Sequence, residues 1–204
     1  MSKSRILSQV IFKAAFLLVT FVIINSNVKA GDFVVDKSAS KVNWEAKKVT
    51  GKHNGTIEIA NGTLSTDKSG INGGTLVIDM KTIADVDLTD AGYNAKLIGH
   101  LKSDDFFAVD KFPESKLLVK KVTLVSGNEY KFLGDLTIKG VTNPIEFTAK
   151  VTQNGDKLNA EGTITVNRAK FGVKYGSSSF FENLGDKVIY DDFTLAFNLA
   201  SQKK

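Results

Sequence analysis

The segment from Tyr130 to Val151 alternates between apolar and polar residues almost without interruption. Such a two-residue period places successive side chains on opposite faces of a strand, so each half of the segment predicts a strand with one dry and one wet face. Residues 139–144 (KGVTNP) separate the two halves and contain the Gly, Asn and Pro residues that favour turns. We therefore expect an antiparallel hairpin whose dry face carries Phe132 and Phe147.

The same alternation recurs in residues 41–47, 56–66, 76–81, 116–125, 158–166 and 193–199. Two of these segments contain an irregularity. Asn61-Gly62 predicts either a tight turn or a bulge within one long strand, and the phase of the alternation slips at Lys120-Lys121. About eight strands joined by turns indicate an all-β sandwich or a closed barrel, and closure would remove the exposed sheet edges.

Two segments do not alternate. Residues 94–103 (NAKLIGHLKS) place apolar side chains at helical spacing and predict one short helix. Residues 167–187 are rich in Gly, Ser and aromatic residues, and we expect a long irregular connection there. An eight-stranded antiparallel barrel has an interior that is either filled by its own side chains or open to one small ligand. Both alternatives fit the alternation.

Residues 1–30 have the three parts of a secretory signal peptide. A basic start precedes the apolar run 14–24 (AAFLLVTFVII), and Val28-Lys29-Ala30 offers small residues at the −3 and −1 positions. The apolar run is shorter than the roughly 20 residues of a membrane span. We expect cleavage after Ala30 and a periplasmic or secreted protein formed by a single domain, residues 31–204. An uncleaved anchor is the alternative.

Composition excludes several kinds of function. The chain has no cysteine, which excludes disulfides, thiolate chemistry and cysteine-based metal sites. Four of the 27 basic residues but none of the 22 acidic ones lie within residues 1–30, so residues 31–204 are almost balanced in charge. This balance gives no reason to expect a nucleic-acid partner.

Motifs for catalysis or metal binding are absent from the sequence. The two histidines, His53 and His100, lie in no metal-binding spacing, and there is no Gly-x-Ser-x-Gly motif. Asp85, Asp87 and Asp90 lie in a polar segment, where Asp commonly forms turns and helix caps. We therefore expect no enzymatic activity, no metal site and no cofactor.

Four segments resemble the YceI-like family of exported proteins: residues 36–44, 99–113, 134–144 (GDLTIKGVTNP) and 167–173 (NRAKFGV). Two positions differ from the family pattern. Ala39 stands where a His is frequent, and an Arg is missing near residues 89–93. The resemblance implies a lipocalin-like, eight-stranded antiparallel barrel with one short helix, and an internal channel that binds a polyisoprenoid, an isoprenoid quinone or a fatty-acid derivative.

The resemblance also turns the aromatic residues of the dry faces into candidate channel residues, although filling a core is the alternative for each. The candidate ligand-binding residues are Trp44, Phe107, Phe132, Phe147, Arg168, Phe171, Tyr175, Phe193 and Phe197. The Arg side chain is suited to a phosphate head group, but a structural salt bridge at the barrel rim is an equal alternative. The expected protein is a lipid carrier, monomeric or dimeric, that makes transient contact with a membrane. A filled barrel that partners a membrane protein is the alternative.

Overall fold

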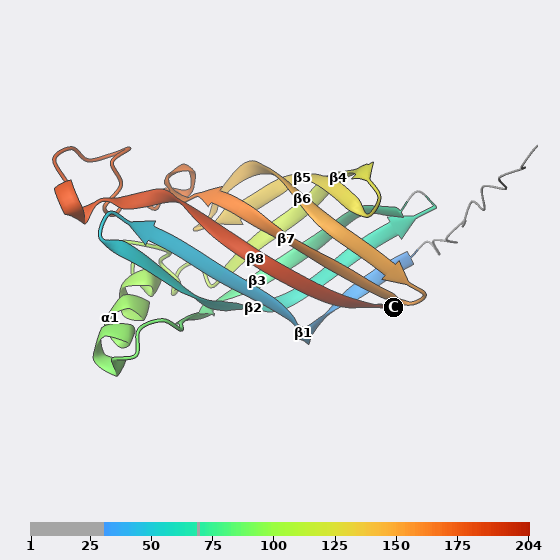
Figure 1. Cartoon of the computed structure of the whole chain (residues 1–204), viewed down its shortest axis with the longest axis horizontal. Coiled ribbons are helices and arrows are strands. Elements are labelled where there is room, and N and C mark those ends of the chain that lie inside the picture. The colour runs from blue at the N-terminus through green and yellow to red at the C-terminus, as the bar shows by residue number, and fades with distance from the viewer. Residues whose placement is uncertain (1–30, 69) are drawn as a thin grey trace, which may run out of the picture.

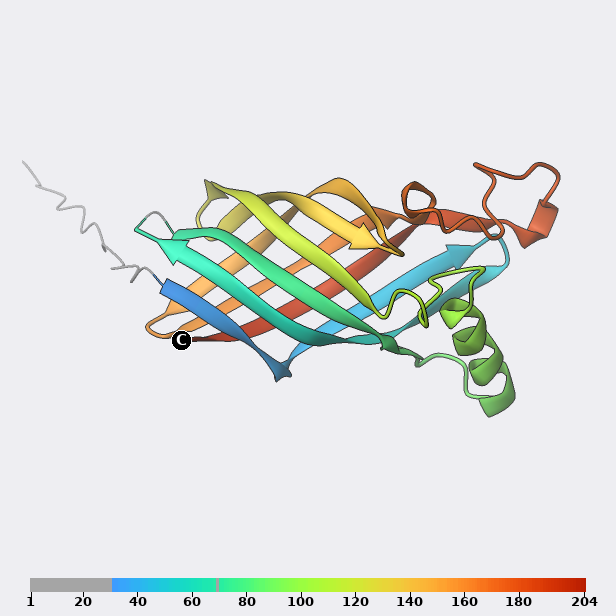
Figure 2. The ribbon, with the colours of Figure 1, turned by 180° about the vertical axis from the view of Figure 1, so that it is seen from behind.

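The computed structural model describes residues 31–68 and 70–204, and these residues form a closed antiparallel barrel in which every strand pairs with its sequence neighbours and β8 pairs with β1 (Figures 1 and 2). The strands are β1 (Gly31–Lys48), β2 (Gly51–Asp67), β3 (Gly70–Asp85), β4 (Glu114–Ser126), β5 (Glu129–Ile138), β6 (Val141–Asn154), β7 (Lys157–Asn167) and β8 (Ile189–Lys203). The predicted all-β, eight-stranded barrel is confirmed. The predicted signal peptide lies outside the described residues.

The hairpin of β5 and β6 follows the alternation, but its turn is shorter than predicted. Only Lys139 and Gly140 lie between the strands, with φ of 50° and 74°, as a two-residue hairpin turn requires. Residues 141–144 belong to β6, and Pro144 pairs with Asp135. Gly140 is also sterically required, because a Cβ there would lie 2.6 Å from a ring carbon of Phe112.

The two irregularities seen in the sequence are bulges. β2 continues through Asn61-Gly62 without turning, and its register with β3 shifts between Ile59 and Asn61. The register between β4 and β5 shifts between Val119 and Lys121, where the alternation slips. An extra residue restores the inward phase of the apolar side chains after each shift, which keeps long strands on a curved barrel surface.

The helix α1 (Ala91–Lys102) lies beside one end of the barrel, between β3 and β4 (Figure 1). It begins three residues before the predicted position, because the side chain of Asp90 accepts a hydrogen bond of 2.9 Å from the Tyr93 N–H and caps the first turn. The side-chain amide of Asn94 donates to the carbonyl oxygens of Asp85 (3.2 Å) and Leu88 (3.3 Å). These bonds fasten the helix to the end of β3. Two short 3-10 segments, η1 (Arg168–Phe171) and η2 (Gly185–Lys187), lie within the predicted irregular connection.

The opposite end of the barrel, where β1 begins and β8 finishes, is densely filled. Phe33 and Leu158 are 0% and 1% exposed, and they belong to strand segments that pair with Lys203 and Ser201 of β8. These two side chains are thus packed inside the barrel near that end.

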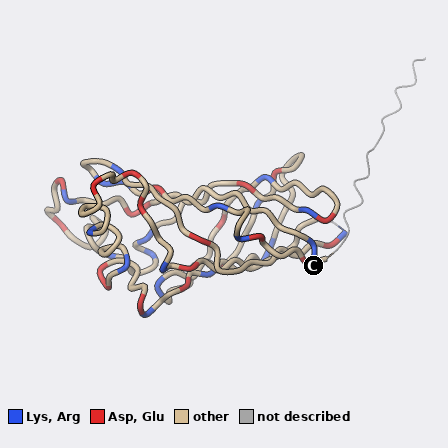
Figure 3. Tube along the Cα trace, turned by 90° about the horizontal axis from the view of Figure 1, so that it is seen from below, with Lys and Arg blue, Asp and Glu red and all other residues tan. Residues whose placement is uncertain are grey.

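The outer surface carries charges of both signs. Figure 3 shows acidic and basic residues interspersed along the barrel. Within the described ranges, no helix has the length and apolar character needed to cross a membrane.

Candidate ligand-binding cavity

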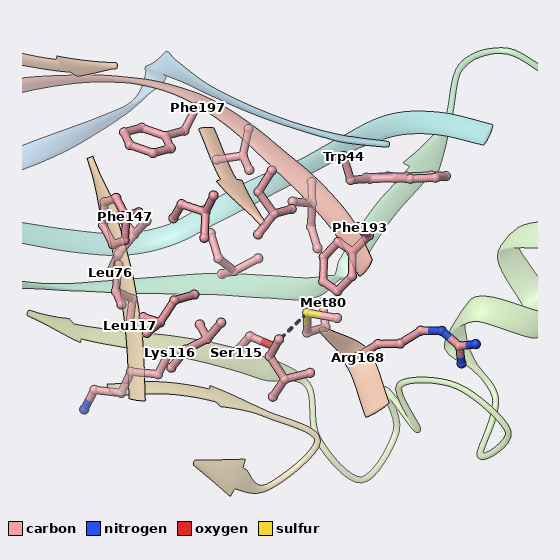
Figure 4. Close-up of a pocket in the computed structure, with 18 of the residues that line it drawn as sticks. Trp44, Leu76, Met80, Ser115, Lys116, Leu117, Phe147, Arg168, Phe193 and Phe197 are labelled. Atoms are coloured by element: carbon pink, nitrogen blue, oxygen red, sulfur yellow. Dashed lines mark hydrogen bonds between the residues drawn. The ribbon is translucent and has the colours of Figure 1, made fainter. Parts of the chain in front are cut away.

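An elongated cavity of about 170 Å³ lies inside the barrel, with an almost wholly apolar wall (Figure 4). All eight strands contribute side chains to it, and so do Leu101 of α1 and Arg168 of η1. In Figure 4, Phe197 and Phe147 lie toward one end of the lining, while Trp44, Phe193 and Arg168 lie toward the other. The barrel is thus hollow along part of its length.

Three phenylalanines build one wall of the cavity. Phe132 and Phe147 are direct cross-strand partners, and their rings are stacked with centroids 5.1 Å apart and an interplanar angle of 3°. Phe147 meets Phe197 edge-on at 6.1 Å and 85°. Offset-stacked and edge-on rings are the favoured geometries of aromatic pairs, so these contacts hold the rings in place as a firm apolar surface.

Near the end with α1, the wall is formed by Trp44, Phe193 and Phe107. The rings of Phe107 and Phe193 meet edge-on at 6.5 Å. The indole N–H of Trp44 donates a hydrogen bond of 3.1 Å to the Ala84 carbonyl, which satisfies its only polar group. Gly55 makes room for this arrangement, because a Cβ there would lie 1.8 Å from the Ala84 carbonyl oxygen.

Few polar groups face the cavity. The hydroxyl of Ser115 donates to the sulfur of Met80 at 3.1 Å, as the dashed line in Figure 4 marks. Among the described residues that line the cavity there is no Asp, Glu or His. The wall therefore offers no carboxylate or imidazole for acid–base catalysis.

Arg168 is only 4% exposed, and its guanidinium has protein partners. It donates to the carbonyl oxygens of Val173 (2.9 Å), Ile189 (2.9 Å) and Tyr190 (3.2 Å), and it lies 3.3 Å from a carboxylate oxygen of Asp191. Burial lowers the pKa of Arg168, and the charge of Asp191 opposes this shift. In Figure 4 its guanidinium points away from the rings of the cavity. This geometry favours the structural alternative for Arg168 over head-group binding.

The structure brings most of the candidate residues together. Seven of the nine line the cavity: Trp44, Phe107, Phe132, Phe147, Arg168, Phe193 and Phe197. Phe171 does not line it, being 3% exposed in a second apolar cluster with Val166. Tyr175 is 47% exposed and places its ring 4.4 Å from that of His100, outside the cavity. Contact of any of these residues with a ligand stays a prediction.

The sequence reasoning missed the pair formed by Met80 and Ser115. Met80 belongs to the alternating segment 76–81, whose inward face carries Leu76 and Ile78. Ser115 lies one two-residue step before Leu117, so extending the alternation of β4 backwards would have placed it on the cavity side.

A closed antiparallel β-barrel around an elongated apolar cavity defines this chain as a lipocalin-like barrel. The family model of the YceI-like domain matches residues 33–201, and the chain belongs to that family. Relatives include a UPF0312 protein of Pseudomonas putida, 26% identical over 170 residues that cover 79% of this chain and 86% of the relative. A UPF0312 protein of Staphylococcus aureus is 37% identical over 86 residues, or 39% of this chain and 47% of that protein.

Solved structures share the barrel. BcnA of Burkholderia cenocepacia has a TM-score of 0.65 and 23% identity, with 81% of this chain and 98% of that chain covered. A polyisoprenoid binding domain from Saccharophagus degradans, implicated in plant cell wall breakdown, has a TM-score of 0.61 and 17% identity, with 84% and 98% covered. At these identities the likeness establishes a common fold.

Proposed function

We propose that this chain is a non-catalytic carrier that holds one long-chain amphiphile, a polyisoprenoid, an isoprenoid quinone or a fatty-acid derivative, inside its barrel. The observation that carries the proposal is the elongated apolar cavity to which all eight strands contribute. The polyisoprenoid binding of the Saccharophagus degradans domain supports this class of ligand. The lack of Asp, Glu and His among the described residues of the wall favours binding over catalysis.

The small volume of the cavity favours a slender apolar chain over a compact ligand. Its volume of about 170 Å³ is below the roughly 300–1,000 Å³ of pockets for compact drug-sized ligands. Each buried methylene contributes about 0.8 kcal/mol, so about ten carbons would offset the several kcal/mol lost on association. Flexible side chains such as Met80 can shift as a longer chain enters, because Met has three rotatable bonds and no branch.

We also propose that the protein is exported, on the basis of the signal-peptide pattern of residues 1–30. A barrel that shields an apolar chain is needed where that chain must cross water, and a periplasmic or secreted protein would meet this need. The alternative, a filled barrel acting only as an interaction surface for a membrane protein, is disfavoured by the cavity itself.

Native mass spectrometry tests the binding of a lipid. The protein, purified gently and then mixed with polyprenol, a quinone or a fatty amide, should show a complex of one chain with one lipid. The apolar wall gives the physical reason, since it offers dry contacts along the whole alkyl chain. Protein that is repeatedly recovered without ligand, and that takes up none of the three added lipids, would contradict the proposal.

A membrane contact site is proposed on the connection between η1 and β8. This connection projects beyond the same end of the barrel as α1 (Figure 1). Phe180 and Phe181 are 44% and 49% exposed there, and the ammonium of Lys174 lies 4.9 Å from the ring centroid of Phe180. Exposed aromatic rings with a nearby Lys are suited to the boundary between head groups and acyl chains.

Replacing both rings, Phe180→Ser with Phe181→Ser, should slow lipid transfer from vesicles severalfold, because the loop loses the apolar area that it inserts. Lipid offered in detergent should bind with unchanged affinity, since neither ring lines the cavity. A matched control is Leu124→Ser with Val125→Ser, which removes equally exposed apolar side chains from the far end of β4. Equal slowing by the two double variants would contradict a specific membrane-facing end.

A further inference from the structure

Three potential ligand atoms meet at the rim of the barrel, beside α1. His53 lies in β2, Asp85 is the last residue of β3, and Asp87 follows in the connection to α1. The Nδ1 atom of His53 lies 3.0 Å from Oδ2 of Asp87 and 4.0 Å from Oδ2 of Asp85. All three ligand atoms lie within 4.8 Å of one another.

Asp85 provides an independent sign that this cluster has a ligand. Its side chain is 0% exposed, and its Oδ1 accepts hydrogen bonds from the Leu88 N–H (2.9 Å) and the Asn94 amide (3.2 Å). Its Oδ2 is buried, faces His53, and has no hydrogen-bond partner. A buried carboxylate oxygen without a partner is costly.

The surrounding hydrogen bonds orient the two carboxylates. Asp87 uses its Oδ1 to accept a 2.7 Å bond from the Asn54 N–H, which turns its Oδ2 toward His53. Asp85 is arranged in the same way, with Oδ1 held by backbone and amide donors and Oδ2 directed into the cluster. In each carboxylate one oxygen is held by N–H donors and the other is directed into the cluster, where Asp87 Oδ2 shares a hydrogen bond of 3.0 Å with His53 Nδ1 and Asp85 Oδ2 has no partner. Hydrogen bonds of this kind orient carboxylate ligands in metal sites.

We propose that His53 Nδ1, Asp85 Oδ2 and Asp87 Oδ2 bind one divalent transition-metal cation such as Zn²⁺. Bonds of about 2.0–2.2 Å to a tetrahedral ion separate its ligand atoms by roughly 3.3–3.6 Å. The distances of 3.0 and 4.0 Å from His53 Nδ1 lie on either side of this range, and all three ligand atoms lie within 4.8 Å of one another, so modest side-chain shifts would bring them to it. One imidazole with two carboxylates suits Zn²⁺ better than Mg²⁺ or Ca²⁺, which prefer oxygen ligands alone.

The cation joins three elements of the barrel end. It links β2 to the end of β3 and to the β3–α1 connection, where Asn94 already fastens α1. The preceding residue, Ala84, accepts the indole hydrogen bond of Trp44. The cation thus holds the rim next to the cavity wall, and its binding does not require a lipid.

Isothermal titration calorimetry with Zn²⁺ on chelator-treated protein tests the site. One Zn²⁺ should bind per chain, and the melting temperature should rise with it. Asp85→Asn, His53→Gln and Asp87→Asn should each weaken binding at least about tenfold, since each removes one of three ligands. His100→Gln is the matched control, because His100 lies with Asp105 outside the cluster, and it should bind Zn²⁺ as the unchanged protein does.

Asp85→Asn gives a second readout that a purely structural carboxylate would not give. Without metal, this variant should melt no lower than the unchanged protein, because an amide in place of the open oxygen can donate to Asp87 and removes an unpaired buried atom. With Zn²⁺ it should fail to gain stability. Absence of Zn²⁺ binding, unchanged binding in His53→Gln and Asp87→Asn, or tighter binding of Mg²⁺ or Ca²⁺ than of Zn²⁺ would overturn the proposal.

Discussion

Phe147→Asp should weaken the binding of a long-chain lipid by about 100-fold or more while the barrel stays closed. Phe147 stacks on Phe132 and meets Phe197 edge-on, so a carboxylate at this position would lie against the path of the alkyl chain. An ionised carboxylate in contact with a buried apolar chain costs several kcal/mol, and each 1.4 kcal/mol changes affinity tenfold. Fluorescence titration with a polyene fatty acid, followed by native mass spectrometry, measures the loss.

Two neighbouring variants make this result specific. Thr148→Asp introduces the same charge one residue further along β6, on the exposed outer face, and should leave uptake unchanged. Phe147→Leu keeps an apolar side chain in the wall and should retain most of the affinity. Circular dichroism and thermal melting establish that each variant is folded. Normal uptake by folded Phe147→Asp protein would show that this part of the cavity does not receive the lipid.

The strand faces were predictable because their geometry depends on local sequence alone. In β5 and β6, alternation fixes which side chains point inward, so Phe132 and Phe147 both face the barrel interior. Their position opposite each other follows from the register that the two-residue turn sets. Asn61-Gly62 was ambiguous, since a tight turn and a bulge have the same residue preferences. Both Asn61 and Gly62 pair with β3, as do strand residues on either side of them, which resolves it in favour of the bulge.

Positions outside the strands were harder to predict. Tyr175 lies in the irregular connection, where no two-residue period relates one side chain to the next, and its ring packs outside the cavity beside His100. The sequence also did not determine whether the barrel is filled or hollow, because the same inward-facing apolar residues fit either interior. Only the packed interior shows that Phe33 is fully buried near one end while an apolar cavity remains inside the barrel.

The cluster at the rim depends on strand register, which the sequence does not specify. His53 and Asp87 are 34 positions apart, and no spacing motif joins them. Gly55 pairs with Asp85 across β2 and β3, and this register brings the carboxylate to the position next to His53. The sequence therefore predicted ordinary turn carboxylates, and for Asp90, which caps α1, that prediction is confirmed.

Arg168→Ala should lower the free energy of unfolding by about 3–5 kcal/mol. The variant leaves the carbonyl oxygens of Val173, Ile189 and Tyr190 without their donor. It also leaves Asp191, 12% exposed, without its cationic partner, while the Ser179 hydroxyl still donates to its other oxygen. Loss of a single partner from a buried ion pair is costly because the remaining charge stays buried. Urea unfolding followed by tryptophan fluorescence of Trp44 measures the change.

Lys170→Ala, a cation removed from the same 3-10 segment, is the matched control and should change the free energy of unfolding by less than about 0.5 kcal/mol. An equally small change for Arg168→Ala would show that the guanidinium is not needed to hold the connection to β8.

A comparison of polyprenol with polyprenyl phosphate then separates the two interpretations of Arg168. If Arg168 only holds the rim, its removal should weaken both ligands by the same factor, because they share the alkyl chain. A loss confined to the phosphate would instead assign the guanidinium to the head group, since Arg binds phosphate through its paired donors.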